Sequence, residues 1–123
     1  SSYAEVFNPA TGQFMRMNMT WDRVGHSATV LPSGQVLVAG GLDDFGQCLT
    51  NTDIFDPNEP NLLFAFRRGP TMPNHHCFHT AATLTDGSIL VAGGGGGDYG
   101  VEASETADLF FLDAISRSGF EFR

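Results

Sequence analysis

Lysine is absent from this chain, and charged residues of any kind are scarce. The six basic residues are all arginine, against fourteen Asp and Glu, and the formal net charge is -8 over 123 residues. Only 16% of the residues are charged, compared with about 25% in an average domain. An acidic chain repels the phosphates of nucleic acids and of anionic membranes, so the sequence predicts neither as a partner.

Long hydrophobic runs are also missing. No stretch is apolar over the length of a transmembrane helix, and the first ten residues, SSYAEVFNPA, lack the basic and apolar regions of a secretory signal. The two cysteines, Cys48 and Cys77, are too few for a disulfide framework and do not identify the cellular compartment. The remaining composition, 41% hydrophobic, predicts one packed domain with a modest core.

One phrase occurs twice in the chain. HSATVLPSGQVLVAGG begins at His26, and HTAATLTDGSILVAGG begins at His79. The copies align without a gap, from the histidine to a closing pair of glycines. A second marker recurs in step with the first, as AEVFNP, TDIFDP and ADLFFLD, and each is an apolar segment that closes on Asn or Asp. Repetition of this kind indicates a modular architecture.

Each repeat unit has the local pattern of β-structure. HSATVL and QVLVAG are short β-prone runs joined by PSG, which predicts a hairpin. VLVAG is apolar at consecutive positions, which predicts a strand buried on both faces, and the glycines after it permit a positive φ or a close backbone approach. TDIFDP and NLLFAFRR (61–68) predict a third and a fourth strand. No segment predicts a helix.

Four antiparallel strands, a glycine pair after the second strand and a period of about 50 residues resemble a kelch-type β-propeller blade. AEVFNPATGQF, RVGHSATVLPSGQVLVAGG and FHTAATLTDGSILVAGGG closely resemble bacterial kelch repeats. The resemblance covers nearly the whole chain and implies an all-β fold in one domain, 1–123. It implies the outer strands of a first blade at 3–16, a second blade at 24–68 and a third blade at 77–123.

This blade count is incomplete for a propeller. About two and a half blades are present, whereas closed propellers need roughly four to eight. An open arc leaves blade faces and strand edges bare. The chain is therefore predicted to be a segment of a longer protein with further blades, or to close the propeller by self-association.

The loops that follow the glycine pairs, and those that join the blades, are predicted to share one face, where binding residues are expected. These loops are 42–51, 69–77 and 95–104. Their candidate binding residues are Asp43, Asp44, His75, His76, Asp98, Tyr99 and Glu102. The group is interpreted either as a site for a polar or cationic ligand, Ca²⁺ included, or as a solvated acidic rim. The carboxylates follow no recognisable Ca²⁺-loop spacing.

Histidine and cysteine in the stretch HHCFH could ligate a metal, but neighbouring strand residues point to opposite faces, so no metal site is predicted. The residues that recur in both copies are assigned a structural role. They are His26, Gly40, Gly41, His79, Gly93 and Gly94. For the two cysteines, a disulfide between adjacent blades and two free thiols both remain open.

The resemblance implies a scaffold that binds protein or carbohydrate through its loop face, without catalysis or a cofactor. No nucleophile motif accompanies the repeated Ser27 and Thr80, and the GGGGGD run lacks the ending of a phosphate loop. The alternative is a fragment of a copper radical oxidase resembling galactose oxidase. That family places a tyrosine before such a histidine, where this chain has Gly25 and Phe78. Such repeats often occur in exported proteins, so the resemblance implies a secreted or extracellular location.

Overall fold

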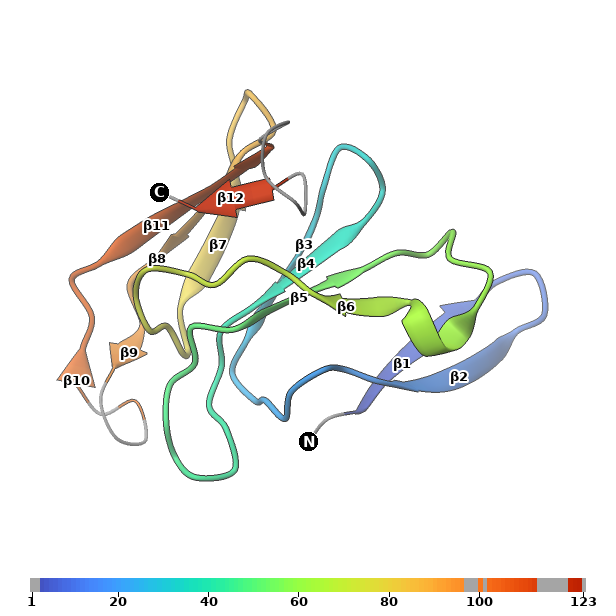
Figure 1. Cartoon of the computed structure of the whole chain (residues 1–123), viewed down its shortest axis with the longest axis horizontal. Coiled ribbons are helices and arrows are strands. Elements are labelled where there is room, and N and C mark those ends of the chain that lie inside the picture. The colour runs from blue at the N-terminus through green and yellow to red at the C-terminus, as the bar shows by residue number, and fades with distance from the viewer. Residues whose placement is uncertain (1–2, 97–99, 101, 113–119, 123) are drawn as a thin grey trace.

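A computed structural model describes residues 3–96, 100, 102–112 and 120–122 (Figure 1). Over these residues the chain is all-β, as predicted, with antiparallel sheets, one short 3-10 turn and no α-helix. None of the described sheets closes on itself. The same residues contain no helix of the length and hydropathy that a membrane span requires.

Three sheets carry most of the strands. The N-terminal hairpin pairs β1 (Tyr3–Asn8) with β2 (Gln13–Asn18). The middle sheet has the order β3-β4-β5-β6, with bounds Ser27–Val30, Val36–Ala39, Thr52–Phe55 and Phe66–Arg68. The C-terminal sheet has the order β7-β8-β11-β12, with bounds Thr80–Thr83, Ile89–Ala92, Ala107–Leu112 and Phe120–Phe122. A short ribbon between β8 and β11 pairs β9 (Gly95–Gly96) with β10 (Glu102–Ala103).

Both copies of the repeated phrase form the same hairpin. β3 pairs with β4, and β7 pairs with β8. The turns close in the same way, since the amide of Leu31 donates to Gln35 O at 2.7 Å and that of Leu84 donates to Ser88 O at 2.8 Å. The turn glycine has a φ of 88° in both copies. The sequence therefore repeats a structural unit as well as a phrase.

The middle and C-terminal sheets pack together through one hydrophobic core. Its buried members are Leu31, Leu37, Ala39, Ile54, Met72, Ile89, Val91 and Phe110. β4 is buried on both faces, as predicted, with Leu37 1% and Val38 5% exposed. In the second copy Leu90 of β8 is 36% exposed. The described chain provides no sheet to cover that outer face.

The predicted fourth strand, 61–68, is wrong over its first half. Leu62–Phe64 forms a 3-10 turn (η1), and β6 begins only at Phe66. Asn61 accounts for the turn, because its side-chain oxygen accepts from the amide of Leu63 at 3.1 Å. Its main-chain oxygen accepts from the amide of Phe64 at 2.9 Å. Such local hydrogen bonds of Asn compete with strand pairing.

Candidate functional site

The long connections gather at one end of the two four-stranded sheets. β4, β6 and β8 end there, while β5, β7 and β11 begin there (Figure 1). The segments at this end are 19–26, 40–51, 69–79, 93–96 and 102–106. We refer to them as the loop end. The tight turns 31–35 and 84–88 lie at the opposite end, so the loop end is where long irregular segments meet.

Asp43 shapes the loop that follows β4. One oxygen of its carboxylate accepts from the amides of Phe45 and Gln47, both at 2.9 Å. Its own amide donates to Gln47 O at 2.9 Å. The loop presents the Phe45 ring to solvent with 83% exposed. The carboxylate of Asp43 is thus used inside the loop and holds a large apolar side chain outward.

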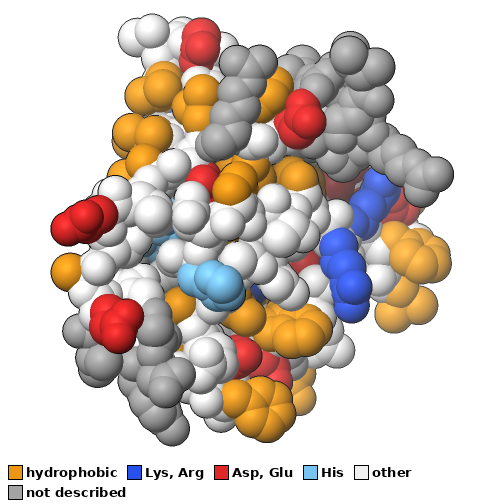
Figure 2. Space-filling model, turned by 60° about the vertical axis from the view of Figure 1, so that its left-hand side comes forward, with side chains coloured by type: hydrophobic (Ala, Val, Ile, Leu, Met, Phe, Trp, Pro, Cys, Tyr) orange, Lys and Arg blue, Asp and Glu red, His pale blue; other side chains and the backbone are white. Residues whose placement is uncertain are grey.

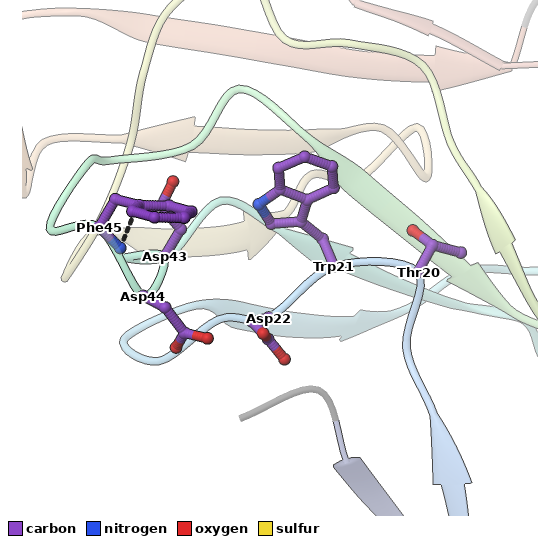
Figure 3. Close-up of a pocket in the computed structure, with 6 residues that line it drawn as sticks. All are labelled: Thr20, Trp21, Asp22, Asp43, Asp44 and Phe45. Atoms are coloured by element: carbon purple, nitrogen blue, oxygen red, sulfur yellow. Dashed lines mark hydrogen bonds between the residues drawn. The ribbon is translucent and has the colours of Figure 1, made fainter.

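An open cavity of about 320 Å³ lies between this loop and the segment that precedes β3. Its lining residues are Thr20, Trp21, Asp22, Asp43, Asp44 and Phe45. In Figure 3 the carboxyl groups of Asp22 and Asp44 lie on the same side, and the rings of Trp21 and Phe45 lie above them. The cavity therefore combines two aromatic walls with two acidic groups.

The two carboxyl groups of this cavity interact with each other. A hydrogen bond that protonated Asp44 donates to the Asp22 carboxylate raises the pKa of Asp44 above its usual value, and the negative charge of Asp22 raises it further. Two neighbouring like charges oppose the simultaneous ionisation of both carboxyl groups. A positive group placed beside them would relieve that repulsion.

The segment that carries Trp21 and Asp22 is anchored on both sides by the buried Asp53 of β5. The amide of Thr20 donates to Asp53 Oδ2 at 3.0 Å, and its hydroxyl donates to Oδ1. On the other side, Nη2 of Arg23 lies 3.5 Å from Asp53 Oδ2. Both anchors hold the intervening cavity residues against the middle sheet.

Arg23 is a buried arginine that also binds the main chain. Its Nη1 donates to Gly40 O at 2.7 Å and to Asn51 O at 3.0 Å. Burial lowers the pKa of its guanidinium, while the nearby charge of Asp53 acts in the opposite direction. Arg23 thereby joins the approach to β3 to the glycine pair and to the start of β5.

His76 has the corresponding role in the C-terminal sheet and does not belong to the exposed surface. It is 0% exposed, and its Nε2 lies 2.9 Å from Oδ2 of Asp108 on β11. Its Nδ1 lies 3.4 Å from Gly93 O. Asn74 completes the cluster, since its amide and side-chain nitrogens lie 3.2 and 2.9 Å from the same carboxylate.

The other predicted binding residues are dispersed. His75 and Glu102 are exposed, on the approach to β7 and on β10, and neither lines the cavity beside Asp44. Asp98 and Tyr99 lie outside the described residues. On the face shown in Figure 2, acidic and hydrophobic side chains are interspersed, and basic side chains gather on one side. Of the predicted residues that the structure describes, Asp43 and Asp44 alone line one cavity together.

The two cysteines form a disulfide. Cys48, in the loop after β4, is bonded to Cys77, on the approach to β7, so the free-thiol alternative is wrong. Main-chain bonds support the link, since the amide of Gly41 donates to His76 O at 2.8 Å and that of His76 donates to Leu49 O at 3.1 Å. The disulfide fastens the loop of one sheet to the entry of the next.

The repeated histidines lie in different surroundings. His79 Nε2 lies 2.9 Å from Ser27 Oγ, across the junction between the two sheets. Burial, followed by the charges of His76 and His26, lowers the pKa of His79 to about 4. His26 is exposed at the corresponding position of the middle sheet, where no described inner hairpin lies beside β3 in the way that β3 lies beside β7. Burial and the charge of Arg23 lower its pKa as well.

The repeated glycines directly follow the second strand of each hairpin, β4 or β8. Gly40, Gly41, Gly93 and Gly94 all have positive φ values. A Cβ at Gly40 would collide with the carbonyl oxygen of His76, and one at Gly94 would collide with that of Cys77. Glycine is therefore required at Gly40 and Gly94 both for its conformation and for its lack of a side chain, whereas at Gly93 only the positive φ favours it.

Sequence reasoning missed the aromatic walls of the cavity and the two buried acids. Neither Trp21 nor Phe45 lies in the repeated phrase or among the candidate binding residues. The acids Asp53 and Asp108 had a visible signal, because each interrupts an apolar strand at the same place, in TDIF and ADLF. A charged residue at a recurrent core position is expected to have a buried partner.

No protein-family model and no curated protein matches this sequence. Within the described ranges, no group of three or more His, Cys, Asp or Glu side chains could hold a metal ion. The geometry of the chain itself therefore carries the functional interpretation.

Proposed function

We propose that this chain is a segment of a kelch-type β-propeller that binds a protein or carbohydrate at its loop end and performs no chemistry of its own. Two four-stranded antiparallel sheets support this architecture, because in each sheet the strands lie side by side in the order in which they occur along the chain. Each sheet corresponds to one blade, and the N-terminal hairpin corresponds to the outer half of another. Further blades of a parent chain, or self-association, would cover the open faces.

The cavity beside Asp44 carries the proposal. Aromatic walls with a few convergent polar groups are typical of binding sites. The faces of Trp21 and Phe45 suit a cationic group or the apolar face of a sugar ring, and the carboxyl groups of Asp22 and Asp44 suit a positive charge or hydroxyls. The net charge of -8 favours a basic partner. A protein segment that presents Arg or Lys is therefore the favoured ligand.

The copper-oxidase alternative gains no support from these residues. Phe78 has no phenol oxygen that could bind copper. Cys77 is bonded to Cys48, so it supplies no free thiolate as a copper ligand. Saturable copper binding by the purified chain would nevertheless favour that alternative over a binding scaffold.

Fluorescence provides a direct test, because Trp21 is the single tryptophan of the chain. Titration with a tetra-arginine peptide is expected to give a saturable change in emission. Asp44→Asn should weaken this binding roughly tenfold, because a charge-assisted contact is lost. Glu105→Gln, which removes an exposed charge away from the cavity, is the matched control.

A neutral linear tetrasaccharide is the second probe in the same assay. A response to the sugar alone would identify carbohydrate as the ligand class. No response to either probe, or equal weakening by Asp44→Asn and Glu105→Gln, would remove the cavity as the binding site.

A further inference from the structure

One edge of β1 has no partner strand within the described chain. The strands β1, β5 and β11 carry the corresponding segments AEVF, TDIF and ADLF. β5 pairs with β4 on one edge and β6 on the other, and β11 pairs with β8 and β12 in the same way. β1 pairs with β2 alone. The place that β4 occupies beside β5, and β8 beside β11, is vacant beside β1.

A cavity of about 260 Å³ marks this vacancy. One wall is the segment Tyr3–Val6 of β1. The opposite wall is a face of the middle sheet, formed by Ala28, Val36, Val38, Phe55 and Phe66, together with Met19 and His26 from the segment that precedes β3. The N-terminal hairpin also exposes Tyr3, Phe7, Phe14 and Met15. A two-stranded hairpin is marginally stable by itself, so its exposed apolar side chains indicate a missing neighbour.

Glu5 indicates the charge of that neighbour. It occupies the position of Asp53 in β5 and of Asp108 in β11. Each of those acids is buried and holds a basic side chain, Arg23 or His76, from the approach to the inner hairpin of its own sheet. Among the described residues, the ion pair of Glu5 is with the cross-strand Arg16, at 3.8 Å, and both side chains are more than half exposed. An exposed pair of this kind contributes little.

His26 indicates a second contact. Its counterpart His79 bonds to Ser27, which belongs to the inner strand of the preceding sheet. His26 faces the cavity beside β1, where the equivalent strand would lie. A hydroxyl at the start of that strand would give His26 the contact that His79 already has.

We propose that β1 accepts a third inner hairpin of the type formed by residues 23–41. The approach to this hairpin carries Arg or His three residues before the inner-strand histidine, and this basic side chain binds Glu5. The pairing of β4 with β5 predicts the register, in which Val6 and Phe7 take the positions of Ile54 and Phe55. The proposal rests on the propeller architecture proposed above, and not on the binding function of the loop end.

A second copy of this chain cannot supply the hairpin. The described residues contain three outer strand pairs, β1–β2, β5–β6 and β11–β12, but only two inner hairpins, β3–β4 and β7–β8. Any exchange of inner hairpins between identical copies leaves one outer pair unfilled in each chain. The hairpin therefore comes from additional polypeptide that carries the repeated phrase.

A fusion tests the inference at the natural spacing. A copy of residues 19–51, carrying Cys48→Ser, is joined directly to Ala4, because Ala4 corresponds to Thr52. The control fusion has the strand segments 27–30 and 36–39 of the copy replaced by Gly and Ser. Hydrogen exchange of the peptide that spans β1 and β2 is expected to slow at least roughly tenfold in the first fusion relative to the control. Equal exchange in the two fusions would overturn the proposal.

The charge contact is tested in the same fusion. Glu5→Gln, and Arg23→Gln in the added copy, should each speed the exchange of β1, and the double variant should add little further because both changes remove one contact. Glu105→Gln is the control and should have no effect. An effect of Glu5→Gln no larger than that of Glu105→Gln would remove Glu5 from the contact. No added ligand is measured, so this outcome is independent of the fluorescence titration.

Discussion

The middle and C-terminal sheets contain the same buried cluster built from different residues. In the middle sheet, Asp53 accepts a hydrogen bond from the amide of Thr20 and forms an ion pair with Arg23. In the C-terminal sheet, Asp108 accepts a hydrogen bond from the side chain of Asn74 and lies within hydrogen-bond distance of the His76 ring. In both, the basic side chain also lies within hydrogen-bond distance of the first carbonyl of the glycine pair, Gly40 or Gly93.

This comparison separates the geometry of the repeat from its chemistry. The geometry requires an acid in the third strand and a donor on the approach to the first strand. An arginine carries its charge at every working pH, whereas a histidine also exists as a neutral ring. The middle cluster therefore contains an arginine–carboxylate ion pair, while the C-terminal cluster joins its carboxylate to an imidazole and an amide, which are able to donate hydrogen bonds without carrying a charge.

The largest expected effect follows from removing the two acids. Asp53→Asn leaves the guanidinium of Arg23 buried without its counter-charge and should lower the free energy of unfolding by about 3–5 kcal/mol. Asp108→Asn leaves a histidine that can be neutral, and should cost about 1–3 kcal/mol. Urea unfolding of the two variants measures both values. Equal losses would mean that the two clusters have the same chemistry despite their different residues.

The disulfide gives the next largest effect and acts on one cluster more than on the other. Cys48 and Cys77 are 29 positions apart, and Cys77 adjoins His76. Replacing both cysteines with Ser should cost about 2–4 kcal/mol, because the unfolded chain is no longer constrained. Hydrogen exchange should accelerate in 72–79 and remain unchanged in 19–24. Acceleration of both segments alike would show that the middle cluster also depends on the cross-link.

The sequence predicted the all-β class, the two hairpins and the loops that share one end, because these follow from local periodicity, turn residues and repetition. It predicted a strand over 61–68, but at 62–64 the chain forms a turn, because the side-chain oxygen of Asn61 accepts a hydrogen bond from the amide of Leu63. It could not choose between a disulfide and free thiols, since that depends on how close the two sheets approach. It also grouped His76 with exposed binding residues, whereas the burial of Asp108 draws that ring inward.

The cavity beside Asp44 was predictable only in part. The length of the acidic loop 42–51 and its position after the glycine pair predict that it carries binding residues. Trp21 reaches the same cavity from a segment far away in the sequence, because Asp53 anchors Thr20 and Arg23 on either side of it. Such convergence depends on tertiary hydrogen bonds that local patterns do not encode.

A third difference between the clusters concerns the residue before each repeated histidine, and its expected effect is smaller. Gly25 has a φ of 67°, and Phe78, at the same position, has a φ of 52°. Gly25→Ala should cost about 1–2 kcal/mol, since a Cβ is disfavoured in this conformation and would meet the Phe78 ring. Phe78→Gly relieves the backbone strain that Phe78 already has at its positive φ, so it should lower the free energy of unfolding less than Gly25→Ala does. Thermal unfolding compares the two variants, and the reverse order would contradict this reading of the strain.

The smallest expected effect is a pH dependence that arises at His79, beside the C-terminal cluster. The pKa of His79 is lowered from 6.5 to about 4, first by burial and then by the charges of His76 and His26. Between these values the unfolded chain binds a proton at His79 more readily than the folded chain does. Stability should therefore be complete above about pH 6.5 and decrease as the pH falls toward 4. Urea unfolding measures how much the free energy of unfolding falls between pH 7 and pH 5. This fall should be smaller in His79→Gln than in the unsubstituted chain. The control is Asp86→Asn, at the opposite end of the sheets, which should leave this part of the pH dependence unchanged. Identical losses in His79→Gln and the unsubstituted chain would assign the acid sensitivity to other groups, with His26 the next to be substituted.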